Sequence, residues 1–282
     1  MDKVVDKLLG DGFRFSKGLG QNFITDTNLL NAIVADSGVT DSETVVEVGA
    51  GAGTLTEAIA RKAKKVVSVE IDTSLESHLT DKFSGCDNVK LVFADILKTS
   101  TDKIKELTDE EPFRVIANVP YYITSPIIFY FLDGGFDVTS LNLMVQKEVA
   151  ERIVSRGGKD YGAISANIQC RAKVKILRTV NRKLFTPPPN VDSAIINIEP
   201  CYRDDVKDYQ QLFALIKSAF SMRRKTLLNC LGGAGIDKAR AEQVLVKAGL
   251  SPSIRGEALT VEQFIALSNV MLDEGLLFGT KA

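Results

Sequence analysis

The chain has 282 residues, of which 45 % are hydrophobic and 25 % are charged, and its formal net charge is −1. This is the composition of an ordinary globular protein, and it excludes wholesale disorder. No apolar run approaches the ~20 residues of a membrane-spanning helix, and the first residues lack the layout of a signal peptide, so we expect a cytoplasmic protein that does not enter membranes. The four scattered cysteines form no CxxC pair and there is a single histidine, so we expect no metal site.

Charge is distributed unevenly along the chain. Residues 26–111 carry 17 acidic and 9 basic side chains, whereas residues 147–183 carry 10 basic and 3 acidic ones. Arg223, Arg224 and Lys225 form a second basic cluster, here called the basic triplet. Two basic clusters favour a surface that binds a polyanion. The low net charge argues against a protein that holds naked nucleic acid through charge alone.

Apolar runs and helical patterns alternate over the first two thirds of the chain. The first 25 residues, rich in Gly and Phe, predict an irregular arm, and a helix is expected from about Asp26 to Asp36 with Asp26 or Thr25 as its N-cap. Two further segments, Thr54–Lys62 and Thr73–Phe83, have the length expected of helices. Buried strands are predicted at Thr44–Val48, Val66–Glu70, Val89–Phe93, Phe113–Ala117 and Leu141–Val145. This alternation predicts an α/β fold with a parallel, doubly wound sheet.

The last third of the chain changes in character. Two further strands are expected at Lys173–Val180 and Ser193–Glu199, which are close enough in sequence to form an antiparallel edge of the sheet. From Tyr209 to Leu277 the pattern is helical only, with breaks at Gly232-Gly233 and near Pro252. We therefore predict an α/β domain over residues 1–202 and a small all-α domain over residues 203–282. No heptad or exposed apolar face is evident, so we expect a monomer.

A glycine-rich turn follows the first predicted strand. Residues 49–53 have the sequence GAGAG and are followed by a helix start at Thr54. Glycines at such a turn, including Gly49 and Gly51, let the backbone approach a ligand at the carboxyl end of a strand. By itself this motif fits a dinucleotide, S-adenosylmethionine or a tight turn without a ligand.

An acidic residue lies at the end of the second predicted strand, and another follows the third. Glu70 lies about 20 residues beyond the turn, where a carboxylate can accept hydrogen bonds from both hydroxyls of a ribose. Asp95 follows the third strand, where it can accept from the exocyclic amine of an adenine. Either acid alone is typical of a helix cap, but three such elements at successive strand ends favour a nucleoside site. A nicotinamide enzyme would need a residue for hydride transfer, and His78, on a predicted helix surface, is a poor candidate.

The fourth predicted strand ends in the most informative segment, Asn118-Val119-Pro120-Tyr121-Tyr122. The exocyclic amine of a base is a poor nucleophile, because its lone pair is delocalised into the ring. The Asn118 side-chain oxygen and the backbone carbonyl of Val119 or Pro120 could accept its two N–H groups and so align the lone pair with a methyl donor. Pro120 would stiffen the loop, and Tyr121 could stack on a base flipped out of its strand. An Asx-Pro turn with aromatic packing is the alternative interpretation.

A proline-rich segment precedes the last predicted strand. Its sequence is Phe185-Thr186-Pro187-Pro188-Pro189-Asn190-Val191-Asp192-Ser193. Proline rigidity would project Phe185 into the cleft, where its ring could sandwich the target base against Tyr121. A stiff connection between domains explains the same prolines.

Taken with other motifs, these segments make the sequence resemble the ribosomal RNA adenine dimethyltransferases, specifically the bacterial KsgA type that acts on small-subunit rRNA. The resemblance covers nearly the whole chain. Its motifs are Lys17–Ile24, Val46–Thr56, Asn118–Tyr122, Met144–Arg152, Phe185–Ser193 and Ala219–Leu227.

The resemblance implies a Rossmann-like methyltransferase sheet, S-adenosylmethionine as cofactor and roles for individual residues. Asn22 and Ile24 would close over the methionine end of the cofactor, and Ile71 and Ile96 would flank its adenine. The remaining cofactor residues would be Gly49, Gly51, Glu70, Asp95 and Asn118. The implied substrate is a pair of adjacent adenosines in a hairpin loop near the 3′ end of small-subunit rRNA. Each would be dimethylated at N6 within a pre-assembled subunit, and the helical domain would bind the ribosome.

Three alternatives remain open. An erythromycin-resistance methylase would act on large-subunit rRNA with the same loop, but such enzymes are markedly basic. A DNA adenine or protein glutamine methyltransferase would carry Asn-Pro-Pro-Tyr, whereas Val119 stands here between asparagine and proline. A non-catalytic ribosome-assembly factor would use the fold only for binding. The family usually has proline at Ala50 and, in bacteria, leucine at Val119; neither departure removes a functional atom.

Overall fold

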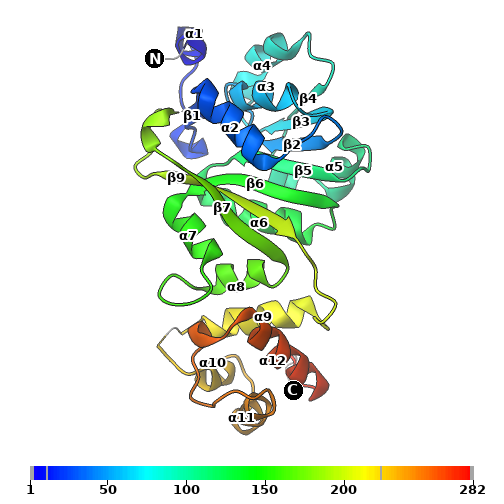
Figure 1. Cartoon of the computed structure of the whole chain (residues 1–282), viewed down its shortest axis with the longest axis vertical. Coiled ribbons are helices and arrows are strands. Elements are labelled where there is room, and N and C mark those ends of the chain that lie inside the picture. The colour runs from blue at the N-terminus through cyan, green and yellow to red at the C-terminus, as the bar shows by residue number, and fades with distance from the viewer. Residues whose placement is uncertain (1–2, 11, 223, 280–282) are drawn as a thin grey trace. The chain divides into compact units, whose positions relative to one another are not determined.

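The computed structural model describes residues 3–10, 12–222 and 224–279. Its contacts divide the chain into two compact units, Met1–Ala150 with Lys175–Pro200 and Glu151–Val174 with Cys201–Ala282 (Figure 1). The predicted domains differ from these units chiefly in one segment. Glu151–Val174 groups with the helical unit, because its Tyr161 and Cys170 belong to the same buried cluster as the later helices.

A seven-stranded sheet forms the centre of the first unit, in the order β4-β3-β2-β5-β6-β9-β7. Its strands are β2 (Thr44–Val48), β3 (Lys65–Glu70), β4 (Val89–Phe93), β5 (Phe113–Asn118), β6 (Val138–Gln146), β7 (Ala172–Val180) and β9 (Ser193–Pro200). The five strands from β4 to β6 pair in parallel, whereas β9 pairs antiparallel with β6. The predicted α/β class with an antiparallel addition to a parallel sheet is confirmed.

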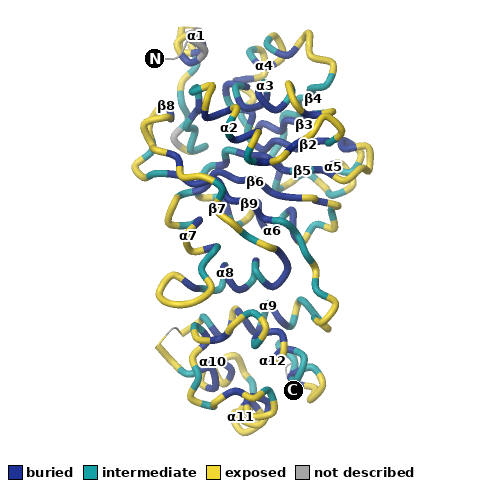
Figure 2. The backbone as a smooth tube through the Cα atoms, in the orientation of Figure 1, coloured by how far each residue is buried: buried dark blue, intermediate teal, exposed yellow. Residues whose placement is uncertain are grey.

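The central strands are largely apolar runs because both faces of the sheet are covered there. β2, β5, β6 and β9 are buried along most of their length (Figure 2). Ile116 packs with α2 (Thr27–Ser37) and α3 (Thr54–Ala60), whereas Phe113 contacts Phe131 of α6 (Thr124–Asp133). Because side chains alternate along a strand, these helices cover opposite faces. The other helices of this region are α4 (Glu76–Phe83), α5 (Thr101–Leu107) and α7 (Lys147–Val154).

The N-terminal arm is more ordered than predicted. It contains a helix, α1 (Lys3–Gly10), although an irregular segment was expected, so that prediction is wrong for these residues. Val5 and Leu8 are three residues apart and form the buried side of this short amphipathic helix. Their spacing indicates a helix, but the Gly and Phe content of the segment favoured the prediction of an irregular arm. Together with Phe13, Phe15 and other residues they pack in a cluster, here called the arm cluster, which includes Phe23, Ala50, Ala52, Leu75, Leu79 and Phe83.

A second, two-stranded ladder anchors the end of the arm. β1 (Phe23–Ile24) pairs antiparallel with β8 (Phe185–Thr186), with Phe23 opposite Thr186 and Ile24 opposite Phe185. Asp26 caps α2 as predicted, because its side chain accepts a hydrogen bond of 2.7 Å from the Leu29 N–H. The arm is thus fixed immediately before α2.

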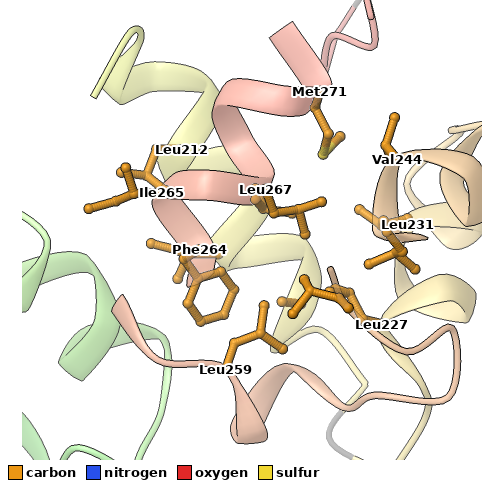
Figure 3. Packing of buried hydrophobic residues seen from close by; sticks show 14 of the residues in the cluster. Leu212, Leu227, Leu231, Val244, Leu259, Phe264, Ile265, Leu267 and Met271 are labelled. Atoms are coloured by element: carbon orange, nitrogen blue, oxygen red, sulfur yellow. The ribbon is translucent and has the colours of Figure 1, made fainter. Parts of the chain in front are cut away.

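The second unit is helical. Its helices are α8 (Ala163–Gln169), α9 (Tyr209–Ala219), α10 (Leu227–Gly233), α11 (Lys238–Lys247) and α12 (Val261–Asp273). Apolar side chains spaced three and four apart on these helices meet in one cluster, in which Leu212, Leu231 and Phe264 are fully buried (Figure 3). α10 ends at Gly233, as the Gly-Gly break predicted. Arg223 of the basic triplet lies outside the described residues, and Arg224 and Lys225 are exposed.

Within the described ranges, no helix has both the length and the apolar character needed to cross a membrane.

Candidate active site

One pocket lies at the carboxyl ends of the central parallel strands. It has a volume of about 250 Å³ and is lined by segments of the arm and of the loops that follow β2, β3, β4 and β5. β2 is followed in the sheet by β3 on one side and by β5 on the other, so the chain reverses its winding direction there. Such a reversal opens a crevice between neighbouring strand ends, which is where open α/β sheets bind their ligands.

The pocket brings together nearly all the residues that the sequence singled out. Those lining it are Asn22, Ile24, Gly49, Gly51, Glu70, Ile71, Asp95, Ile96, Asn118, Pro120 and Tyr121. They come from five segments that are far apart in the chain, and the parallel order of the strands is what collects them at one edge.

The glycine-rich turn forms the floor beside the end of β2. Gly51 has φ +55°, and a Cβ added to it would lie 3.1 Å from the ring of Phe23. Glycine is required there because the conformation is left-handed and the arm packs closely against the turn. The Gly51 N–H donates a hydrogen bond of 2.8 Å to Oε2 of Glu70, which ties the turn to the end of β3.

Glu70 is held rigidly at that strand end. Oε1 accepts a hydrogen bond of 2.8 Å from the Asp72 N–H, so each carboxylate oxygen has one backbone donor. The side chain is buried, and this burial raises the pKa of Glu70, although the two N–H donors act in the opposite direction. Each oxygen keeps a further lone pair, so the group suits a ligand with two neighbouring hydroxyls.

Asp95 follows β4 and lines the pocket from the next loop. Its Oδ1 accepts from the Leu97 N–H at 3.1 Å, and its Oδ2 lies 3.3 Å from Nζ of Lys98. Asp95 therefore caps the short helix η3 (Ile96–Lys98), as an acid in this position commonly does, and the same residue also lines the pocket. Two isoleucines line the pocket beside these acids: Ile71 is half exposed and Ile96 is buried.

Asn118 is the last residue of β5. Its Nδ2 donates a hydrogen bond of 2.9 Å to the backbone carbonyl of Asn22 in the arm. This bond distinguishes Nδ2 from Oδ1 and so fixes the orientation of the side-chain amide. Among the described residues, nothing donates a hydrogen bond to Oδ1. An oriented acceptor thus lines the pocket without a protein partner.

The loop after Asn118 is stiffened by proline and by a hydrogen bond. Pro120 (φ −54°) precedes the short turn η4 (Tyr121–Ile123), and its carbonyl accepts from the Ile123 N–H at 3.1 Å. The Tyr121 hydroxyl lies 2.7 Å from Oγ of Ser193 on β9, a fully buried group. Partial burial raises the pKa of Tyr121 above its usual value, so the hydroxyl stays protonated.

The position of Phe185 differs from the expectation that its ring projects into the cleft. It does not line the pocket: its side chain is only 3 % exposed, in a cluster with Ile24, Leu29 and Leu30. The ladder between β1 and β8 turns the residue inward, because Phe185 pairs with Ile24. In this structure its ring cannot sandwich a base against Tyr121.

Sequence reasoning missed several contacts at the pocket. Gln21 joins the arm to Asp72, and Thr54 donates to the Ile24 carbonyl at 2.6 Å. His78 is only partly exposed, with Nε2 3.3 Å from the Ala52 carbonyl oxygen. These contacts join segments distant in sequence, so no local pattern predicts them. Among the residues that the structure describes, no group of His, Cys, Asp and Glu suits a metal ion.

Comparison with known sequences identifies relatives over nearly the whole chain. The family model "Ribosomal RNA adenine dimethylase" matches residues 12–272. The ribosomal RNA small subunit methyltransferase A of Clostridioides difficile is 41 % identical over 266 residues, which cover 92 % of this chain and 91 % of the relative. The protein of the same name from Clostridium acetobutylicum is 40 % identical over 270 residues, covering 95 % and 96 %.

Solved structures agree with this assignment. A dimethyladenosine transferase from Plasmodium falciparum matches with a TM-score of 0.78 and 26 % identity, covering 91 % of this chain and 99 % of that one. The 23S rRNA methyltransferase ErmE matches with a TM-score of 0.67 and 27 % identity, covering 88 % and 99 %. The family model spans far more than half of the sequence and the bacterial relatives exceed 30 % identity, so the chain belongs to the ribosomal RNA adenine dimethylase family.

Proposed function

We propose that the protein transfers methyl groups from S-adenosylmethionine to the exocyclic N6 amines of two adjacent adenosines in small-subunit rRNA. The observation that carries this proposal is the orientation of Asn118, whose oxygen lines the same pocket as Glu70 and the glycine-rich turn. Relatives that are about 40 % identical bear the name small subunit methyltransferase A, which favours the small subunit over the large one.

The residues of the pocket fit the proposed cofactor. Glu70 offers two fixed acceptors for the ribose hydroxyls, and Asp95 offers an acceptor for the adenine amine between Ile71 and Ile96. Asn22, Ile24, Gly49 and Gly51 would enclose the rest of the molecule. When bound, S-adenosylmethionine supplies a methyl group activated by its attachment to a positively charged sulfur.

Asn118 would prepare the nucleophile. Its Oδ1 accepts one N–H of the adenine amine, and the Val119 carbonyl accepts the other, because the Pro120 carbonyl already has the Ile123 N–H as a partner. Two acceptors draw the nitrogen out of conjugation with the ring, so that its lone pair points away from both N–H bonds. They also stabilise the positive charge that develops on nitrogen, without rearranging during the reaction.

Tyr121 would hold the target base. Its hydrogen bond to Ser193 fixes the ring at the pocket, and an aromatic face is a suitable stacking partner for a base turned out of its strand. No general base is required, because the methylated ammonium is acidic and loses its proton to water. Release to water also allows a second methyl transfer to the same nitrogen.

The helical unit would provide contact with the ribosome. Arg224 and Lys225 are exposed on it and follow α9. Residues 147–183, which are divided between the two units, carry ten further basic side chains. With a net charge of only −1, the protein would depend on the shape of a pre-assembled subunit as well as on charge. We infer that a cytoplasmic monomer performs the reaction.

Methyl transfer from labelled S-adenosylmethionine tests the proposal. Small subunits lacking adenosine dimethylation are incubated with the protein beside large subunits and plasmid DNA, and product nucleosides are identified by mass spectrometry. Dimethyladenosine confined to small-subunit RNA is the expected result. Label in the large subunit would move the assignment to a methylase of the erythromycin-resistance type, and cofactor binding without any label would indicate an assembly factor.

A further inference from the structure

The N-terminal arm forms one wall of the pocket, and it is fastened at several points. Residues 19–24 all line the pocket. At the far end of this segment the Ile24 carbonyl accepts from Thr54, and β1 pairs with β8. In its middle the Asn22 carbonyl accepts from Asn118. These contacts fix the arm along the sides of the pocket formed by β2 and β5.

A separate contact fastens the arm on the side of β3. Nε2 of Gln21 donates a hydrogen bond of 2.6 Å to Oδ2 of Asp72, two residues that are 51 positions apart. Oε1 of Gln21 accepts from the Ser16 N–H at 2.8 Å, so both ends of the amide are used and its orientation is fixed. This is a short bond to a carboxylate, the stronger class of hydrogen bond.

Asp72 itself is fixed by its surroundings. Its Oδ1 accepts from the N–H and the hydroxyl of Ser74 at 3.0 and 2.6 Å, which caps the short helix η2 (Thr73–Leu75). Its backbone N–H donates to Oε1 of Glu70. One residue therefore contacts the arm through its side chain and the proposed ribose acceptor through its backbone.

We propose that the hydrogen bond between Gln21 and Asp72 is a latch that holds the arm closed over the cofactor. Gln21 and Asp72 are positioning residues, and they act by slowing the escape of the ligand from a pocket whose wall is the arm. Breaking the latch frees the segment between Phe15 of the arm cluster and Asn22, while the packing of the arm cluster and the contacts of Asn22 and Ile24 remain. The inference rests on the proposed function, because it takes S-adenosylmethionine as the ligand.

Cofactor dissociation rates test the latch in the full-length protein. Gln21→Ala and Asp72→Ala should each speed the release of S-adenosylmethionine by about tenfold, as expected for the loss of a hydrogen bond to a charged group. Because both variants remove the same bond, the double variant should release the cofactor no faster than either one. KM for the cofactor should rise more than kcat falls. Asp72→Asn keeps an acceptor oxygen and should give an intermediate rate.

Two control variants separate the latch from general loss of structure. Asp36→Ala removes a carboxylate that bonds to Arg178 away from the pocket, and it should leave the release rate unchanged. Ser74→Ala weakens the cap of η2 while leaving the Gln21 bond in place, so it should also release the cofactor at the normal rate. If Asp72→Ala speeds release and Gln21→Ala does not, Asp72 acts through the cap and the latch is refuted.

Hydrogen exchange gives a readout that needs no ligand. Amides of residues 16–21, between Phe15 of the arm cluster and Asn22, should exchange faster in Gln21→Ala than in the wild type, whereas amides of α2 should be unaffected. Equal exchange in the arm of both proteins would overturn the latch. Failure of the wild type to bind S-adenosylmethionine would instead refute the proposed function, and exchange in the arm would still decide whether the latch exists.

Discussion

The side-chain amide of Asn118 donates a hydrogen bond of 2.9 Å to the backbone carbonyl oxygen of Asn22. Asn118 is the last residue of β5, and Asn22 lies in the N-terminal arm. Since an amide that donates through nitrogen must present its oxygen on the other side, the arm determines how the proposed catalytic acceptor is oriented. The same contact therefore orients the proposed acceptor and is one of those that hold the arm at the pocket.

Replacing Asn118 should affect turnover far more than cofactor binding. Asn118→Ala removes the oriented acceptor, and kcat should fall by ~100-fold or more, the scale for losing one preorganised hydrogen-bonding group in an active site. Glu70 and Asp95 would remain, so the dissociation constant of S-adenosylmethionine, measured by calorimetry, should change much less. Turnover close to that of the wild type would contradict the proposed mechanism.

Phe185 should prove to be a residue of the core. Phe185→Ala would leave a cavity beside Ile24 and Leu29 and should lower the free energy of unfolding by about 3–5 kcal/mol in a denaturant titration. Phe185→Leu retains most of the apolar volume, so it should cost less and preserve methyl transfer. A Phe185→Leu protein of normal stability that has lost activity would show that the ring contacts the substrate in another conformation.

Glu47 should make stability depend on pH. It is fully buried on β2, with Oε2 accepting from Thr56 and Ser68 and no partner for Oε1 among the described residues. Burial raises the pKa of Glu47 to about 8. The folded state therefore binds a proton that the unfolded chain releases above its ordinary pKa of 4.5, and the stability contributed by this group is lost as the pH rises towards 8.

The variant Glu47→Gln isolates this effect, because glutamine resembles the protonated acid at every pH. The free energy of unfolding of the variant, relative to wild type, should increase between pH 5 and pH 8 by up to about 1.4 kcal/mol per pH unit and then level off. Parallel urea titrations across this range would measure it. A constant difference would mean that Glu47 titrates near its ordinary pKa in the folded protein.

The exposed cations after α9 should contribute to binding of the ribosomal subunit. Replacing Arg224 and Lys225 with glutamine should weaken binding and reduce the slope of log affinity against log salt by about 1–2, one for each phosphate that the protein no longer neutralises. Lys64 and Lys103, which pair with Glu111 and Glu106, give a control with the same change of charge. An unchanged slope in the first variant would assign the two cations to the structure of the helical unit.

Local patterns were sufficient to predict the sheet and most of the pocket. Glu70, Asp95 and Asn118 could be recognised because each lies at or just beyond the end of an apolar run, and the parallel topology then brings such ends together. Contacts between distant segments were not predictable in this way. No sequence pattern links Gln21 with Asp72, although their side chains form a hydrogen bond. Likewise, the sequence does not reveal that Phe185 pairs with Ile24, and this pairing turns the phenylalanine away from the cleft.

The pairing of β1 with β8 also bears on how the protein is made. Phe23 and Thr186 are opposite one another, so the arm is synthesised about 160 residues before the strand with which it pairs. At about 5–20 residues per second, its partner emerges on the order of ten seconds later. Nascent chains stopped before Phe185 lack one anchor of the pocket wall, so we expect this wall to be completed only after all the parallel strands have been translated.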